Sequence, residues 1–203
     1  MFPFDGILFD IGGVLLTNGW DVRERAVVLD HFGLDRATFE FRHVAPNDAW
    51  ERDAISLRQY LDATVFYEPR TFTHEEFFDF FLTQSRLLPD GAIAILEELA
   101  SGGNYLLGVL NNEAREPNDY RLSHFGLRNF LDVTLSSCYL GLRKPDPAIY
   151  RRALDILGKP AERILFIDDR AENVAAAQAA GIVGLRFEGA DSLRTKLAAL
   201  GVL

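Results

Sequence analysis

Three aspartates stand where apolar runs of this sequence end. Asp10 follows Phe9 in the segment FDIGGVL (residues 9–15), and Asp168 and Asp169 follow Ile167 in the segment FIDD (166–169). An uninterrupted apolar run is typical of a strand buried on both faces of a parallel sheet, and open α/β sheets bind ligands beyond the carboxyl ends of such strands. The pattern therefore predicts that the three carboxylates meet in one crevice.

Carboxylates gathered in this way repel one another unless a cation lies between them. Their oxygens suit Mg²⁺, which commonly binds through one or two carboxylates together with a substrate phosphate. The sequence thus predicts a magnesium site beside a candidate nucleophile.

The composition narrows the classes of protein that this chain can belong to. It has 203 residues, 48% hydrophobic and 25% charged, as expected for one globular unit, with a subdomain allowed by its length. Acidic residues outnumber basic ones by 30 to 21, for a formal net charge of −9. We see no basic run, so a nucleic-acid partner is disfavoured. No apolar stretch reaches the roughly 18 residues of a membrane span.

Two further features predict a cytoplasmic protein. The chain leads almost directly into its first expected strand, which leaves no room for a signal peptide. Its single cysteine, Cys138, cannot form an internal disulfide and fits a reducing compartment. We interpret Cys138 as a small buried apolar residue.

Expected strands and helices alternate along most of the chain. Strands are expected at residues 7–10, 105–110, 133–137, 164–167 and 182–187. Helices are expected at residues 92–100, 147–157, 171–180 and 191–200. Gly102-Gly103 favours a left-handed helix end, and Asp146-Pro147 supplies a helix cap and first turn. The alternation predicts an α/β fold with a Rossmann-like parallel sheet core.

The interval from residue 17 to residue 88 breaks this alternation. Ser56 with Gln59, and Thr73 with Glu76, match capping boxes, so helices should begin at both places. The second helix carries four phenylalanines on more than one face, which indicates packing on both sides or the wall of a pocket. We expect an α-helical cap subdomain at 17–88, inserted into a core formed by 1–16 and 89–203. Extra helices placed elsewhere on the sheet are the alternative.

Four segments together resemble the haloacid dehalogenase-like (HAD) hydrolase superfamily. They are Asp10 in FDIGGVL, Asn111-Asn112 after LGVL, Lys144 in GLRKPDP, and Asp168-Asp169 with Asn173 in DDRAEN. Their order and spacing match the family, and the inserted helices stand where its first type of cap is found. The segments look most like the branch of sugar-1-phosphate phosphatases and the N-terminal phosphatase domain of epoxide hydrolases.

The resemblance implies a role for each of the charged residues. Asp10 would be the nucleophile that forms an aspartyl-phosphate. It would also bind Mg²⁺ together with the backbone carbonyl of Gly12 and the carboxylate of Asp169. Asp168 would complete the metal site, acting through water or by holding the lysine. Lys144 would add positive charge beside the nucleophile and the phosphate.

The asparagines would hydrogen-bond the phosphate or stabilise the helix that follows the paired acids. Asn111 is expected to be catalytic by donating to phosphate, with Asn112 offering a further donor. Asn173 lies four residues after Asp169 and is expected to brace the start of its helix.

Two positions depart from the family pattern. Gly12 stands where family phosphatases usually carry a second aspartate, which protonates the leaving oxygen and later activates water. Such an acid–base group is typically worth ~10²–10⁴-fold in rate, so we expect a preference for good leaving groups. The resembling sugar-1-phosphate branch also has glycine there. Asn111 replaces the usual Ser or Thr, although an amide can also donate a hydrogen bond.

Three functions follow from this pattern. The first is a Mg²⁺-dependent phosphatase acting on a small phosphorylated metabolite, with a sugar phosphate as one option. The second is a catalytically weak or inactive binding or regulatory protein, which Gly12 and Asn111 favour. The third is a metal-independent 2-haloacid dehalogenase, but dehalogenases lack the paired acids that this chain has at Asp168 and Asp169.

Substrate identity would be decided by the expected cap. Candidates for contact are Trp20, His43, Trp50, Glu51 and Arg52, the last three in a stretch that we interpret as a loop. His43 and Trp50 are types more often used in packing. A monomer and a homodimer, with the phenylalanine-rich helix at the contact, both remain open.

Overall fold

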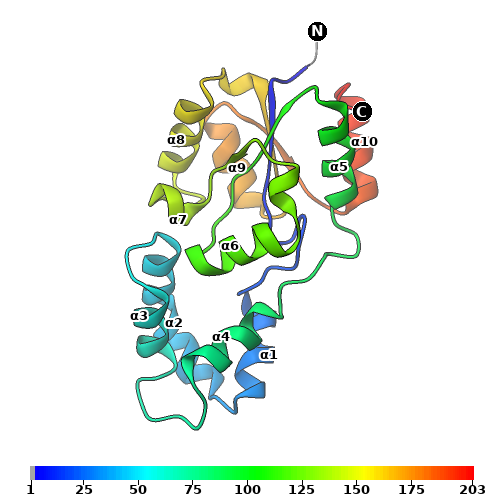
Figure 1. Cartoon of the computed structure of the whole chain (residues 1–203). Helices are drawn as coiled ribbons and strands as arrows, with labels where there is room; N and C mark the ends of the chain where they lie inside the picture. Colours follow the sequence, from blue (N-terminus) through cyan, green and yellow to red (C-terminus); the bar gives the residue numbers. More distant parts are fainter. Residues whose placement is uncertain (1–2) are drawn as a thin grey trace.

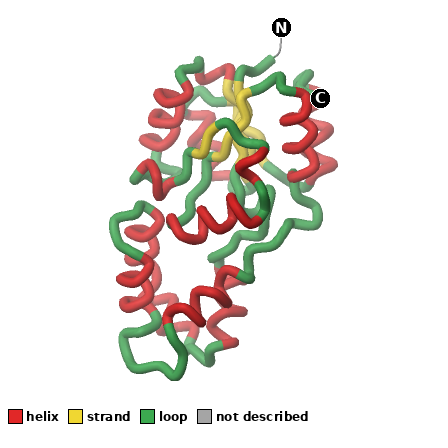
Figure 2. Tube along the Cα trace, in the orientation of Figure 1, coloured by secondary structure: helices red, strands yellow, loops and turns green. Residues whose placement is uncertain are grey.

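Five short strands form one parallel sheet in the computed structural model, which describes residues 3–203 (Figures 1 and 2). The strands are β1 (Gly6–Phe9), β2 (Leu106–Val109), β3 (Val133–Thr134), β4 (Ile164–Asp168) and β5 (Val183–Arg186). Their order in the sheet is β3-β2-β1-β4-β5. Since β1 lies between β2 and β4, Phe9 is paired with Val109 on one side and Ile167 on the other. The residues that follow these strands therefore begin side by side.

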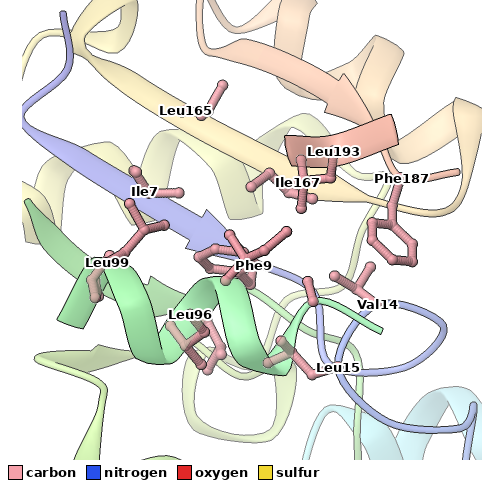
Figure 3. Packing of buried hydrophobic residues seen from close by; sticks show 14 of the residues in the cluster. Ile7, Phe9, Val14, Leu15, Leu96, Leu99, Leu165, Ile167, Phe187 and Leu193 are labelled. Carbon is pink, nitrogen blue, oxygen red and sulfur yellow. The ribbon is translucent and has the colours of Figure 1, made fainter. Parts of the chain in front are cut away.

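Helices cover both faces of this sheet, which explains why its central strands β1, β2 and β4 are apolar up to their carboxyl ends. On one face, α5 (Ile93–Gly102) and α10 (Ala190–Ala199) pack on Ile7, Phe9 and Ile167, as Figure 3 shows at close range. On the other face, α8 (Pro147–Leu157) and α9 (Ala171–Ala179) pack on Leu8 and Phe166. The alternation of neighbouring side chains between two separate clusters follows the period of two of a strand. The Rossmann-like α/β core is thus confirmed.

A second group of helices lies beyond the sheet (Figure 1). It consists of α1 (Val22–His31), α2 (Arg36–Glu51), α3 (Leu57–Thr64) and α4 (His74–Leu82). Both capping boxes form, at Ser56 with Gln59 and at Thr73 with Glu76. These helices share an aromatic cluster of their own, with Trp20, Trp50 and Tyr60 among its buried residues.

The phenylalanines of α4 pack on both sides of the helix. Phe77 and Phe81 are buried in the aromatic cluster, and Phe78 and Phe80 are partly buried against it. The ring of Phe80 also stacks on His31 at a centroid distance of 3.8 Å. The four side chains therefore hold the helical group together, and none of them lines the cavity described below.

The two segments that join this helical group to the core run side by side. Leu16 forms an antiparallel bridge with Leu87, and the Thr17 N–H donates to the Arg86 carbonyl at 2.9 Å. The Thr17 hydroxyl also donates to the Gln84 carbonyl at 2.8 Å. This arrangement is compatible with the expected division at residues 16–17 and 88–89, which stays a prediction.

Two further helices complete the core: α6 (Arg115–His124) and α7 (Ser137–Leu140). Single 3₁₀ turns lie at Leu127–Asn129 and Ala161–Arg163. The expected strand at 133–137 was too long, because Ser137 already begins α7, whose end is closed by Gly141 in the left-handed conformation. Within residues 3–203, no helix combines the length and hydropathy that a bilayer span requires.

The expected loop at Trp50–Arg52 was wrong. Residues 50 and 51 form the last turn of α2, and Arg52 is its C-cap. The helix is polar and contains Pro46, so it lacks the apolar stripe from which a helix is predicted. Polar pairs at i,i+4 stabilise it instead: Asn47 donates to Glu51 at 2.9 Å, and Arg52 pairs with Asp48 at 3.0 Å.

Candidate active site

The ends of β1 and β4 place two carboxylates around one buried lysine. Lys144 Nζ lies 3.1 Å from Asp10 Oδ1 and 2.6 Å from Asp168 Oδ2. Asp168 is fully buried, and Lys144 is 4% exposed. Although burial opposes its charge, the Asp10 and Asp168 carboxylates raise the pKa of Lys144, so that it is held as a cation.

Asp168 is saturated with hydrogen bonds. Asn173 Nδ2 donates to both of its carboxylate oxygens, at 3.1 and 3.0 Å, and the Arg170 N–H donates to Oδ1 at 2.8 Å. Together with Lys144, these donors fix the carboxylate at the strand end. Asp168 is therefore placed to hold the lysine, and Asn173 braces Asp168.

The carboxylates of Asp10, Asp168 and Asp169 suit a divalent cation. Each can bring one oxygen to within 4.8 Å of the others. Asp169 Oδ1 is buried and has no hydrogen-bond partner among residues 3–203. Gly13, with φ of +70°, lies against this group, and a Cβ at that position would overlap the Asp169 carboxylate. An unpartnered oxygen beside a second carboxylate is what a hard cation would satisfy.

The carboxylates of this cluster raise one another's pKa values, in addition to the larger effect of burial. Burial raises the pKa of Asp10 to about 7, with Asp168 raising it further and Lys144 opposing the change. Burial, followed by the Asp168 carboxylate, also raises the pKa of Asp169. The three acids outnumber the two cations that act on them, Lys144 and Arg170, and a further cation would complete their neutralisation.

A cavity of about 140 Å³ opens in front of Asp10. Its core side includes Gly12, Asn112, Lys144 and Asn173, while Trp20, Asp21, Arg25, Asn47 and Glu51 line it from the helical group and the segment leading into it. Apart from Gly12 and Trp20, every residue in its wall is polar or charged. The helical group therefore does cover the carboxyl ends of the strands, as a cap would.

The two asparagines after β2 are engaged with the protein. Asn111 is 1% exposed; its Nδ2 donates to Asn118 at 3.0 Å, and its Oδ1 accepts from the Ser136 hydroxyl at 2.7 Å. It does not line the cavity. Asn112 does, but its amide exchanges two hydrogen bonds of 2.8 Å with the backbone of Lys144. Asn112 thus fixes the lysine loop, and phosphate contact by either side chain stays a prediction.

The five candidate contacts in the cap divide into two groups. Trp20 and Glu51 line the cavity, whereas His43, Trp50 and Arg52 do not. His43 Nδ1 lies 2.7 Å from the Tyr60 hydroxyl in the aromatic cluster. Trp50 stacks on Tyr60 at 4.3 Å and donates to Glu116 at 3.1 Å. These two are packing residues, and Arg52 pairs with Asp48.

Several charged residues of the cavity wall were missed in the sequence. Arg143 Nε lies 2.6 Å from Glu51 Oε2, and Arg170 Nη2 donates to Asp21 at 2.8 Å, so both join the core to the cap. Their places beside Lys144 and Asp169 were a usable signal. Arg121, 2% exposed, donates to Glu113 at 2.6 Å, and burial raises the pKa of Glu113 to about 7. No spacing in the sequence links Arg121 to the other site residues.

The fold and the site now define a class of protein. The family model of haloacid dehalogenase-like hydrolases matches residues 4–181. The chain belongs to this family.

Known relatives agree with that assignment. The chain is 31% identical over 201 residues to the sesquiterpene phosphatase astK of Aspergillus oryzae, which covers 95% of this chain and 93% of the relative. It is 37% identical over 113 residues to a phosphoglycolate phosphatase of Rhodospirillum rubrum, covering 56% of this chain and 46% of that protein. A solved HAD family enzyme of Bacteroides thetaiotaomicron, in a magnesium complex, superposes with a TM-score of 0.79 at 17% identity, over 92% and 94% of the two chains. The last likeness shows the fold alone.

Proposed function

We propose that this chain is a Mg²⁺-dependent phosphatase that acts on a small phosphate monoester through an aspartyl-phosphate at Asp10. The observation that supports this most directly is the position of Asp10 between Lys144 and the unpartnered carboxylate oxygen of Asp169, at the floor of a polar cavity. The phosphatases among the relatives point the same way.

Asp10 would act through its second carboxylate oxygen. Oδ1 accepts from the Ile11 N–H at 2.8 Å and pairs with Lys144, whereas Oδ2 accepts no hydrogen bond from the described residues. Oδ2 would form a bond to phosphorus as the bond to the leaving oxygen breaks. The leaving oxygen takes the electron pair and a proton from water. A second water then attacks the aspartyl-phosphate, which frees phosphate and restores Asp10.

Lys144 would stabilise the charge that gathers on the phosphoryl oxygens. Its ammonium is fixed by Asp168, so that no reorganisation is needed during the reaction. The proposed cation ligands are the carboxylates of Asp10 and Asp169 and the Gly12 carbonyl, with Asp168 behind them. A bound Mg²⁺ there would offset the repulsion between the nucleophile and the phosphate.

The cavity favours a small hydrophilic substrate. Its volume of about 140 Å³ is below the roughly 300 Å³ at which pockets for drug-sized molecules begin. Arg25, Asn47 and Glu51 face it from the cap and offer hydrogen bonds rather than apolar surface. We therefore propose a short polar ester, with a sugar or polyol phosphate as the first choice, in preference to a fifteen-carbon terpenoid.

The test is release of inorganic phosphate from a panel of sugar, polyol, nucleotide and terpenoid monophosphates, with MgCl₂ or with EDTA. We expect turnover of a polar ester that requires Mg²⁺, and a fall of more than about 10³-fold in Asp10→Asn, since that variant lacks the nucleophile. Turnover that persists in Asp10→Asn, or in EDTA, would contradict the mechanism.

Two other functions are distinguished by the same experiment. Phosphate binding without turnover of any ester would favour the binding or regulatory protein that Gly12 suggests. Chloride release from 2-chloropropionate without Mg²⁺ would favour a dehalogenase, although the paired acids argue against it. We also keep the proposal of a cytoplasmic enzyme, since Cys138 is unpaired and buried.

A further inference from the structure

The space beside Gly12 is occupied by another residue. A Cβ built on Gly12 would lie 2.9 Å from Asn18 Oδ1 and 3.8 Å from Asn18 Cγ. The first distance is shorter than van der Waals contact and the second is an ordinary contact. Any side chain at position 12 would therefore compete for space with the amide of Asn18. The volume next to the nucleophile loop is therefore filled from six residues further along the chain.

The amide of Asn18 is available to a ligand. Its side chain makes no hydrogen bond to residues 3–203, and it lines the cavity together with Asp10 and Lys144. The backbone around it is fixed, because the Asn18 carbonyl accepts from the Trp20 N–H at 2.7 Å and the neighbouring Thr17 is tied to Gln84 and Arg86. A polar group held in place without a partner, at the wall of a cavity, is suited to a polar ligand.

The acids of the cavity wall are already engaged. Asp21 accepts from Arg170, Glu51 is paired with Arg143, and Glu113 is paired with Arg121. The three atoms nearest to a Cβ at Gly12 all belong to Asn18. The Asn18 atom nearest to Gly12 is Oδ1, an acceptor, and Nδ2 of the same amide is the donor that a leaving oxygen would need; the amide cannot transfer a proton.

We infer that Asn18 is a catalytic residue that stands in place of the acid–base side chain missing at Gly12, and that its Nδ2 donates a hydrogen bond to the leaving oxygen of the ester. This inference rests on the proposed function and specifies the group beside its leaving atom. The leaving oxygen would be oriented by Asn18 and would take its proton from water. The consequence is a rate that depends strongly on leaving-group acidity.

The kinetic test compares a good and a poor leaving group. The substitution Asn18→Asp replaces the side-chain amide with a carboxyl group of nearly the same size. We expect the ratio of kcat/KM for β-glycerophosphate to kcat/KM for p-nitrophenyl phosphate to rise at least about tenfold, the lower part of the range of acid–base catalysis. In Asn18→Ala, the same ratio should fall, because the poorer leaving group needs the hydrogen bond more. Asn129→Asp, on an exposed residue outside the cavity, is the control with the same change of charge and should keep the wild-type ratio.

A second measurement does not need turnover. Orthovanadate with Mg²⁺ mimics a phosphoryl group with an apical oxygen, and the side-chain amide resonance of Asn18, assigned by its loss in Asn18→Ala, should shift when both are added. An unchanged resonance with bound vanadate would overturn the inference, as would an Asn18→Asp ratio that stays at the wild-type value or falls. If the wild type hydrolyses no ester, the proposed function fails, while the resonance still decides the role of Asn18. Thermal unfolding of each variant confirms that it is folded.

Discussion

At the residue scale, the site consists of buried side chains of opposite charge that lie next to one another. Lys144 lies within 3.1 Å of Asp10 and 2.6 Å of Asp168, and all three residues are buried. A buried ion pair contributes little net stability. Removing one partner is nevertheless destabilising, because it leaves an isolated charge in a medium of low polarity. The lysine therefore has a structural role in addition to its proposed catalytic one.

This balance gives a stability prediction for Lys144→Met. We expect the free energy of unfolding to fall by about 3 kcal/mol, because Asp168 loses its cation while remaining fully buried. Urea denaturation without metal measures the change. Lys159→Met, on the exposed surface, is the matched control and should lie within about 0.5 kcal/mol of the wild type. Equal stability of the two variants would show that the lysine does not balance Asp168.

At the element scale, the cap is held by its aromatic cluster and by polar pairs to the core. Trp20 and His43 both meet the Tyr60 hydroxyl, each at 2.7 Å, so one phenol joins α2 and α3 to the segment that enters the cap. Arg143, Arg115 and Arg170 of the core pair with Asp48, Asp53 and Asp21 of the cap side. The cluster stabilises the cap itself, and the ion pairs fix its position over the cavity.

The buried His43 gives the cap a dependence on pH. Burial, with Arg25 nearby, lowers the pKa of His43 to about 4, against about 6.5 for an unfolded chain. Between these values the unfolded state binds a proton that the native state does not, so stability is lost as the pH falls below about 6.5.

We therefore expect the wild type to lose about 2 kcal/mol more than His43→Gln when the pH is lowered from 7 to 5. Glutamine keeps a polar group near Tyr60 but does not titrate. Urea unfolding at both pH values measures the two losses, and carboxylates common to both proteins cancel in the difference. Equal losses would contradict the low pKa of His43.

At the scale of the whole molecule, the cap is an insertion whose two ends meet. The antiparallel bridge between Leu16 and Leu87 and the hydrogen bonds of Thr17 bring the segments together at the edge of the core. Loop closure over a short gap costs little entropy. The core carries Asp10, Lys144, Asp168 and Asp169, whereas the cap supplies polar groups that line the cavity.

This arrangement predicts that the cap can be removed. Joining Thr17 to Arg86 through two glycines should give a core that still unfolds cooperatively and still binds Mg²⁺, measured by circular dichroism and calorimetry. Its preference among polar esters should fall several-fold, because Arg25, Asn47 and Glu51 are lost. A chain that fails to fold would show that the core requires the cap, and unchanged selectivity would show that the cap does not read the substrate.

Much of the fold could be predicted from patterns of residue type. The apolar runs that end in Asp10 and Asp168 indicated neighbouring parallel strands, because only a strand covered on both faces is apolar throughout. Ser56 and Thr73 marked helix starts through local hydrogen bonds that need no tertiary contact. In contrast, α2 could not be predicted from an apolar pattern, since it is stabilised by polar pairs and contains Pro46. The hydrogen bonds of the Asn111 amide to Asn118 and Ser136 were likewise not predictable, and its contact with phosphate stays a prediction.

The sequence by itself determined the sheet, the family and the acidic cluster, because each depends on residue type and order at short range. Only the tertiary structure decided what surrounds Asp10, the candidate nucleophile. Arg143 meets Glu51 and Arg170 meets Asp21 where the core and the cap face each other, and Asn18 fills the space beside Gly12 as the chain passes from the core to the cap. Such contacts join residues whose spacing follows no local period, so they exist only once both subdomains are packed together.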